Sequence, residues 1–447
     1  MEPTEEKITT ETHLDADLSN RLQEIFDEGE VEVLKVVSPS VDTDEEAAFL
    51  NGAEKIPALT YPKLQDPATI EKITKYIERL ESFKQELKAT MMPHFKAKET
   101  KNPEYILALL YLKKVNDLLA SYKGLIATSQ IKDKRQTAYS RFLFGDANPE
   151  EAARYNQALD ALVEEKRSAA TANDGAEKGP TSKPKLSGSQ IAEVFNMYLQ
   201  KYGWDEWKAE ANSKVAVVTT YPQTKTIAIP EGFNCTYERV IQLLAGQLKT
   251  RVFTQHDETT NPEGKRLALL KNGPGYENLL EGMVMHHEGM VSDESNDEFT
   301  ALLRASAVGW ARTEAPTEVF KKINSYYKEY LGLKEKTARK KSWDMYKRLY
   351  RGTRGQNTGA YSTRLVTYQK GLELVNGYLE HGLDGKTPGK FEDLFIGKIS
   401  LDDLERYHEL GFKEGPEHRK PPADPTAIQG YRDEVHQMID DVTGTAA

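Results

Sequence analysis

One part of the chain carries a clear β-strand pattern, and this limits the fold more than any other feature of the sequence. β-Branched residues dominate Lys214–Thr220 and Lys225–Ile229, and Pro222 lies in the short turn between them. These two segments predict a hairpin, to which a third strand from elsewhere could add. Most of the remaining chain repeats its apolar residues at three- and four-residue steps, which predicts helices. The expected fold class is therefore α+β, mostly helical, with a small sheet directly before the helix of residues 236–253.

Helices are expected on both sides of this hairpin. Before it, one begins at Pro67 and is expected to end at Pro93, and a second begins after Pro103. A third follows Asn148, which can cap it, and Pro149, which suits the first turn. After the hairpin, helices are expected at residues 236–253, 276–291, 297–313, 317–330, 335–350, 362–380, 401–410 and 427–441.

Charge and composition divide the chain into five parts. Residues 1–60 hold 16 acidic and 4 basic side chains, a balance of −12 within a net charge of −10, so the rest of the chain carries about +2. This leader has few aromatic residues and is expected to be mostly disordered. The expected parts are an acidic leader (1–60), a helical N-terminal part (61–166), a low-complexity linker or surface insertion (167–187), the main domain (188–420) and a C-terminal helix and tail (421–447).

Composition argues against several classes of protein. No apolar run reaches the 18 residues of a transmembrane helix, and the first residues lack the basic start and apolar stretch of a secretory signal. The single cysteine, Cys235, excludes a disulfide framework and a thiolate-only zinc site. The nearly neutral body lacks the basic stripe that nucleic-acid binding requires. We expect a cytoplasmic protein with neither a membrane nor a nucleic acid as its partner.

Two motifs suggest chemistry that their context does not support. His286 and His287, with Glu281 nearby, resemble a metal site, but adjacent helical residues point about 100° apart and cannot readily bind one ion together. Arg351 and Tyr361 lie around a glycine-rich stretch that resembles a phosphate-binding loop. That stretch lacks the strand-to-helix context and the G-K-[ST] ending of such loops. The residues alone therefore predict neither a metal site nor a nucleotide site here.

Four motifs, taken in their order along the chain, resemble those of the microtubule-associated tyrosine carboxypeptidase family, including its bacterial branch with a Q-E-G-L-type motif. Lys225–Glu231 is similar to the strand that precedes the zinc helix of that family, and Leu280–Met283 stands where the family has E-G-L-A. Arg348–Gly352 and Phe395–Leu401 are similar to its C-terminal signatures. The similarity runs from about residue 100 to residue 420. It implies a zincin-like metallopeptidase fold for the main domain.

The resemblance implies zinc chemistry for the active members of the family. Their H-E-x-x-x-H motif and a downstream Glu hold the ion with one position open for water. The Glu beside the first His takes the proton of that water as general base. Residues i and i+5 lie about 140° apart on an ideal α-helix, so the active members need a local bulge there. By the same resemblance, the loop of Arg351 and Tyr361 borders the substrate cleft.

In this chain most of the zinc motif is missing from the aligned hexapeptide Gly-Gln-Leu-Lys-Thr-Arg. Gly246 replaces the first His, Gln247 the general base and Arg251 the second His, while Glu281 remains at the third ligand position. A shift of the helix does not restore the motif, because residues 95–255 contain no histidine. A lone carboxylate does not retain zinc against competing ligands. Loss of a general base alone costs about 10²–10⁴ in rate.

We therefore expect a pseudopeptidase with no intact catalytic or metal-binding residue and no cofactor. Its relic cleft would bind the C-terminus of a peptide or protein. Without zinc, Glu281 needs a counter-charge, and the Arg251 guanidinium is expected to reach Glu281 or Glu277. Arg251 could instead bind the terminal carboxylate of a peptide. The candidate cleft residues are Arg251, Glu281, His286, Arg351 and Tyr361.

Two other functions stay open from the sequence. The first is an active metallocarboxypeptidase, or another hydrolase, with a variant metal site drawn from His256, Glu281, His286 and Glu288. The second is an interaction protein that acts through its acidic leader. The oligomeric state does not follow from the sequence.

Overall fold

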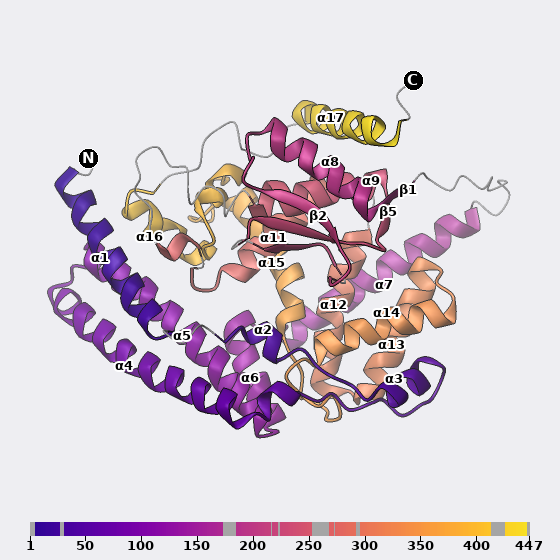
Figure 1. Ribbon diagram of the computed structural model, residues 1–447, viewed down its shortest axis with the longest axis horizontal. Coiled ribbons are helices and arrows are strands. Elements are labelled where there is room, and N and C mark those ends of the chain that lie inside the picture. Colours follow the sequence, from indigo (N-terminus) through magenta and orange to yellow (C-terminus); the bar gives the residue numbers. More distant parts are fainter. Residues whose placement is uncertain are drawn as a thin grey trace.

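The computed structural model describes residues 5–26, 31–172, 185–215, 217–221, 224–252, 268–271, 273–291, 296–412 and 425–444. The predicted α+β class with far more helix than strand is confirmed, and Figure 1 shows a small sheet set among many helices. Within these ranges, no helix combines the length and apolar character needed to cross a lipid bilayer. Residues 173–184 of the predicted linker lie outside the described residues, and α7 and β1 occupy its two ends.

The N-terminal helices are α4 (Pro67–Ala97), α5 (Pro103–Ser129), α6 (Asp133–Phe144) and α7 (Pro149–Ala172). In Figure 1, α4, α5 and α6 lie at the lower left of the molecule, and α7 lies to the right of them. The side chains of Asp66, Asn102 and Asn148 accept hydrogen bonds from first-turn N–H groups of α4, α5 and α7, which confirms the predicted cap at Asn148. The prediction that Pro93 ends the first helix was wrong. Proline removes one hydrogen bond, and α4 has a long buried face against α5 that outweighs this loss.

The acidic leader, expected to be mostly disordered, is described at residues 5–26 and 31–60. Its described part forms α1 (Glu5–Glu24), α2 (Val33–Val36) and α3 (Thr43–Leu50), followed by a 3₁₀ turn at Pro62–Leu64. Phe49 is buried against the rings of Phe320 and Trp343. Glu46 accepts a hydrogen bond from the Trp343 indole and pairs with Lys347 at 3.0 Å. A few apolar side chains and one acidic group thus fix α3 on the body, while residues 1–4 and 27–30 lie outside the described residues.

The predicted hairpin is present, although its first strand begins at Thr219 and not at Lys214, and a third strand joins it. β3 (Thr219–Tyr221) runs antiparallel to β4 (Thr226–Pro230), and β2 (Lys208–Asn212) runs parallel to β4 on its other side. Every residue of the central strand β4 is buried. Among the described residues β3 pairs only with β4, so β3 is an edge strand. A separate antiparallel pair joins β1 (Lys185–Ser187) to β5 (Asn234–Thr236).

Helix α8 (Gly188–Lys201) packs on β2 and β4, and α17 (Pro425–Thr443) lies outside α8 (Figure 1). Ser187 caps α8. The Gln190 amide N–H donates to the Ser187 hydroxyl at 3.4 Å, and the Ser187 N–H donates to the Gln190 side chain at 3.0 Å. This reciprocal capping box starts α8 directly at the end of β1.

The other elements follow in the order that the sequence predicted. They are α9 (Tyr237–Leu243), a π-helix (Leu244–Val252), a 3₁₀ turn (Ala268–Lys271), α11 (Tyr276–Met290), α12 (Asn296–Thr313), α13 (Pro316–Leu331), α14 (Glu335–Leu349), a 3₁₀ turn (Arg364–Val366), α15 (Thr367–His381), two 3₁₀ turns (Phe391–Ile396, Leu401–Asp403) and α16 (Leu404–Glu409). Helix α7 packs against α12 and α13, so the N-terminal helices and the later helices share one continuous apolar core.

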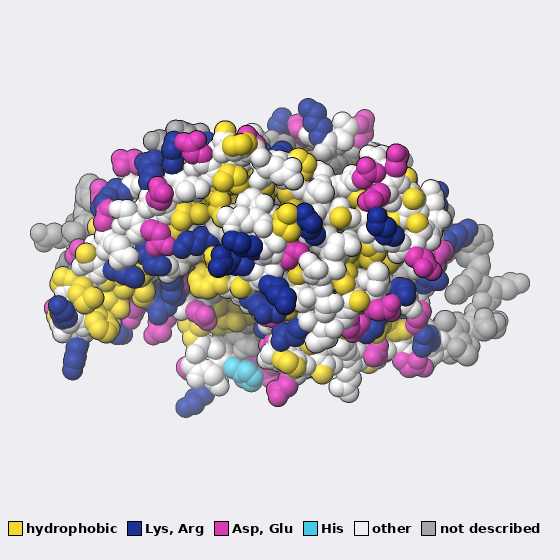
Figure 2. Space-filling view, turned by 90° about the horizontal axis from the view of Figure 1, so that it is seen from below, with side chains coloured by type: hydrophobic (Ala, Val, Ile, Leu, Met, Phe, Trp, Pro, Cys, Tyr) yellow, Lys and Arg dark blue, Asp and Glu magenta, His cyan; other side chains and the backbone are white. Residues whose placement is uncertain are grey.

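Charged side chains of both signs cover the surface. On the face that Figure 2 shows, a group of Lys and Arg side chains lies near the middle, with acidic groups towards both ends. This mixture agrees with the nearly neutral body expected from the sequence.

Helices α11 and α15 cross through two glycines. A Cβ built on Gly282 would lie 2.1 Å from the backbone oxygen of Gly371, and one built on Gly371 would lie 2.1 Å from the oxygen of Asn278. Backbone atoms cannot move aside as the end of a side chain can, so both positions require glycine. Gly282 belongs to the Leu280–Met283 motif, and this crossing gives that motif a packing role.

We predict that Gly282→Ala or Gly371→Ala lowers the free energy of unfolding by about 1–3 kcal/mol, because the methyl group forces the two helices apart. Denaturant unfolding measures this change. Gly289→Ala on α11 and Gly377→Ala on α15 are matched controls, since a Cβ at either position would meet no atom within 4 Å. The controls should be neutral or stabilising by up to about 1 kcal/mol. Equal effects at all four positions would contradict a close crossing.

Candidate functional site

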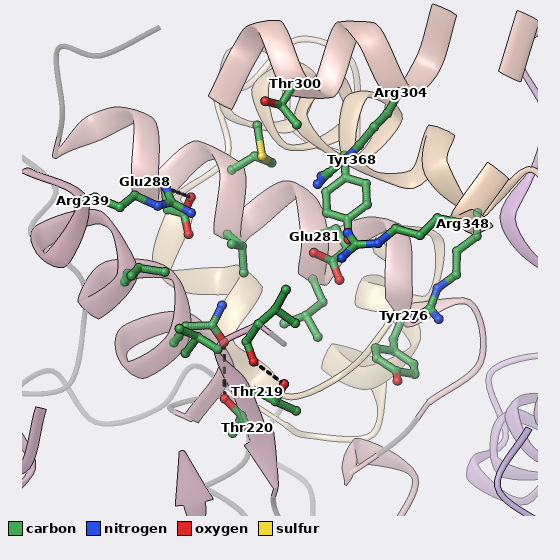
Figure 3. Close-up of a pocket in the computed structure, with 18 of the residues that line it drawn as sticks. Thr219, Thr220, Arg239, Tyr276, Glu281, Glu288, Thr300, Arg304, Arg348 and Tyr368 are labelled. Carbon is green, nitrogen blue, oxygen red and sulfur yellow. Dashed lines mark hydrogen bonds and ion pairs between the residues drawn. The ribbon is translucent and has the colours of Figure 1, made fainter. Parts of the chain in front are cut away.

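A cavity of about 620 Å³ lies between the edge of the sheet and the helices that follow it. Its walls come from β3, α9, the π-helix, α11, α12, α14 and α15. Figure 3 shows Arg239 and Glu288 on one side, Arg304, Tyr368, Glu281 and Arg348 on the other, and Thr219 and Thr220 of β3 at the lower edge. The charged side chains that line it are Arg239, Glu281, Glu288, Arg304, Arg348, Arg364 and Lys398.

The aligned hexapeptide lies in the π-helix. Thr236 caps α9 by accepting a hydrogen bond from the Arg239 N–H at 3.4 Å, and the helix changes to π geometry at Leu244. In a π-helix the backbone hydrogen bond joins residues i and i+5, so Gly246 and Arg251 lie one turn apart on the same side. The bulge that the motif spacing implies for active family members is therefore present in this chain. Such segments are rare and occur frequently at functional sites.

Glu288 fills the space beside Gly246. A Cβ built on Gly246 would lie 2.3 Å from Oε1 of Glu288 and 3.0 Å from its Cδ. Glu288 is only 4% exposed. Arg239 donates from Nη1 to Oε2 of Glu288 at 3.2 Å and to the Gln242 side chain at 2.9 Å. An Arg–Glu pair with a buried carboxylate therefore lies beside Gly246, the position aligned from the sequence with the first histidine of the family motif.

The other described positions aligned with the zinc motif face the cavity and are not filled by a paired side chain as position 246 is. Gln247 lines the cavity, and the Thr220 hydroxyl donates to its side-chain oxygen at 3.3 Å. Glu281 also lines the cavity and acts electrostatically on Arg364. The side chain of Arg251 lies outside the described residues, so its predicted pairing with Glu281 or Glu277 stays a prediction.

Cationic groups concentrate on the side of the cavity opposite Glu288. The Arg304 guanidinium lies 4.2 Å from the ring centre of Tyr368, and Arg364 approaches Glu277 at 3.5 Å. Burial alone would lower the pKa of Arg364, but the carboxylates of Glu277 and Glu281 outweigh it and raise that pKa. The described lining contains five cations and two carboxylates. This side of the cavity therefore favours an anion.

Arg351 lies behind this cationic group and does not line the cavity. Burial lowers the pKa of its guanidinium, and the neighbouring charges of Arg364 and Arg348 lower it further. The sequence marked Arg351 but missed Arg304, Arg348, Arg364 and Lys398 as lining residues, because they come from separate elements that only the fold brings together. The Arg348–Gly352 and Phe395–Leu401 motifs, which contain Arg348 and Lys398, were the signals near them.

The remaining sequence candidates lie outside the cavity lining. His286 shares a hydrogen bond of 3.0 Å with Asn376 and packs on Phe391, and its burial lowers its pKa. Tyr361 is fully buried, and its hydroxyl accepts a hydrogen bond from Arg141 at 2.6 Å. Both side chains have structural contacts away from the space that a cavity ligand would occupy. His256 lies outside the described residues.

The residues of this cavity do not fit a zinc ion. Position 246 offers no ligand atom, and the carboxylate that fills its space is already paired with Arg239. A guanidinium at that point repels a second cation. Across the described ranges, no three His, Cys, Asp or Glu side chains are grouped so that they could hold a metal ion.

The fold and the cavity together define a mostly helical α+β protein with a charged cavity beside a π-helix. The sequence model of the family described as microtubule-associated tyrosine carboxypeptidase matches residues 50–429. The chain therefore belongs to this family, as its motifs predicted, and the match extends beyond the predicted span at both ends. No curated protein is significantly similar to the chain.

We predict that Arg239→Met lowers the free energy of unfolding by about 2 kcal/mol, because it removes a charged partner of the buried Glu288. This expected loss is smaller than the loss of about 3–5 kcal/mol typical of breaking a fully buried ion pair, because the Arg239 side chain is one-third exposed. The double variant Arg239→Met/Glu288→Met should lose about 1–2 kcal/mol less stability than the two single variants lose when their losses are added. Denaturant unfolding of the four proteins measures this coupling.

The exposed pair of Lys321 and Glu318 on α13 is the matched control, and its coupling should be below about 0.5 kcal/mol. If both pairs couple to the same small extent, Arg239 does not compensate Glu288.

Proposed function

We propose that this chain is a catalytically inactive member of its family, built on a zincin-like scaffold, and that its cavity binds the C-terminus of a peptide or protein. The single observation that carries the proposal is the Glu288 carboxylate beside Gly246, in the space of a missing ligand. A general base is missing as well, since the amide of Gln247 has no basic site to accept a proton from water. A cytoplasmic location, which the composition suggests, is part of the same proposal.

Binding of a terminal carboxylate is supported by the cationic side of the cavity. Arginine presents a planar fork of N–H donors that matches a carboxylate, and such charge-assisted hydrogen bonds are about twice as strong as neutral ones. Arg304 and Arg348 lie on the same side of the cavity (Figure 3), and Arg364 and Lys398 add to the positive charge of its lining. One carboxylate can be held there without any metal.

The edge strand β3 supports a peptide as the ligand. Residues Val217–Thr220 line the cavity, and among the described residues β3 pairs with β4 alone. An extended peptide can add to such an edge through backbone hydrogen bonds, with affinity that depends little on its sequence. A peptide on β3 would place its end in the cavity.

The variant metal site that the sequence left open finds less support. Of its four residues, Glu288 is paired with Arg239, and His286 is bonded to Asn376 outside the cavity lining. Only Glu281 remains in the cavity as a candidate ligand among the described residues. We therefore keep the inactive, peptide-binding protein as the proposed function.

The proposal predicts that a short fluorescent peptide ending in tyrosine with a free carboxylate binds the full chain, and that its C-terminal amide binds about 10–100-fold more weakly. Fluorescence anisotropy measures both affinities. Arg348→Ala should weaken the free peptide by a similar factor, whereas Arg135→Ala, at an exposed arginine of α6, should not.

The same protein should contain no stoichiometric zinc by mass spectrometry and should leave the peptide intact. Removal of the terminal tyrosine that a chelator abolishes would overturn the inactivity. Equal affinity for the acid and the amide would overturn the role of the terminal carboxylate.

A further inference from the structure

We infer that the Arg239–Glu288 pair closes the former ligand position, so that restoring the family's residues on the π-helix does not by itself create a zinc site. The inference rests on the proposed function, in which position 246 is a lost ligand position. It goes further, because it assigns the block to two residues outside the zinc motif.

The steric part of the argument concerns Glu288. A Cβ at position 246 would lie 2.3 Å from its Oε1, 3.0 Å from Cδ and 3.1 Å from Cγ, so any side chain there meets the whole end of this glutamate. A free glutamate would relieve such a contact by rotating away. Rotation here would take the carboxylate away from Arg239, which holds it at 3.2 Å.

Burial makes that rotation costly. The side chain of Glu288 is only 5% exposed, so the carboxylate that Arg239 pairs with lies largely out of water. A buried charge without its partner is strongly destabilising. Arg239 and Gly246 belong to one continuous helical segment, and both contact Glu288 of α11. The ion pair and the space beside Gly246 are therefore held in a fixed relative position.

Charge acts in the same direction. A zinc ion at a ligand set that includes position 246 would lie near the Arg239 guanidinium, and like charges at such distances repel. The pair therefore opposes a metal both by occupying space and by placing a positive charge there. The same ion pair also holds α9, and the π-helix that continues it, against α11.

Zinc binding tests the inference directly. The restored variant carries Gly246→His, Gln247→Glu and Arg251→His, and the opened variant adds Arg239→Ala and Glu288→Ala. The control variant adds Arg432→Ala and Glu238→Ala to the restored variant instead. That second Arg–Glu pair is partly buried on α9 and α17 and lies outside the cavity lining.

We expect the opened variant to retain about one zinc per chain after dialysis. Its Kd, from titration against a chromophoric chelator, should be at least about 10-fold lower than that of the restored and control variants. Equal Kd values for the restored and opened variants, whether tight or weak, would overturn the inference. Stoichiometric zinc in the unaltered chain would instead overturn the proposed function, so the two failures are distinguishable.

A second measurement needs no metal and only small substitutions. Gly246→Ala alone should lower the Tm by about 3 °C or more, since its methyl group meets the held carboxylate. In a chain that already carries Arg239→Ala and Glu288→Ala, the same substitution should leave the Tm within about 1 °C. If Gly246→Ala lowers the Tm equally in both backgrounds, Glu288 does not close position 246.

Discussion

The crossing of α11 and α15 is the contact on which the geometry of the cavity depends. Gly282 and Gly371 bring the two backbones together, so α11 has little freedom to shift along or away from α15. Glu281 and Glu288 are both on α11 and line the cavity, seven residues apart. A helix returns nearly to the same side after seven residues, so one rigid helix supplies both carboxylates. The glycine crossing on one side thus positions the charged groups on the other.

The π-helix gives the site a backbone suited to two ligands five residues apart. A π segment is rare and is normally found as a single bulge, yet here it spans Leu244–Val252. Two histidines at the spacing of the H-E-x-x-x-H motif would need such a segment, because the π hydrogen bond sets such residues one turn apart. In this chain neither position carries a histidine, but the backbone keeps the form. Buried side chains such as Leu244 and Leu248 hold it in place through the core and not through a ligand.

The sequence predicted the helices and the hairpin well because their signals are local. The patterns at residues 276–291 and 335–350 correspond closely to α11 and α14, and β-branched residues mark β3 and β4. The site was less accessible because its partners are distant in sequence. Nothing near Gly246 in the sequence indicates that Glu288 occupies the space beside it, because glycine has no side chain whose chemical type could indicate a partner. The packing of Phe49 in the leader was not visible from the sequence for a related reason, because the rings that it contacts, Phe320 and Trp343, lie far along the chain.

Electrostatics explains why a compensating arginine was expected and why Arg239 meets this need at Glu288. A carboxylate left in a cavity without its metal needs a cation, and the sequence suggested Arg251 because it replaces a ligand. Arg239 is on α9, the helix that precedes the π-helix of Arg251, and it contacts Glu288 at 3.2 Å. The Arg239 side chain remains one-third exposed to water. A partly hydrated guanidinium loses less hydration than a fully buried one, so the pair can be stable where a fully buried pair would roughly break even. Glu281, in contrast, lies beside the cationic group of Arg304, Arg348 and Arg364, which supplies positive charge from several elements. The two carboxylates of α11 that line the cavity are thus balanced separately, Glu288 by a fixed pair with Arg239 and Glu281 by several cationic groups.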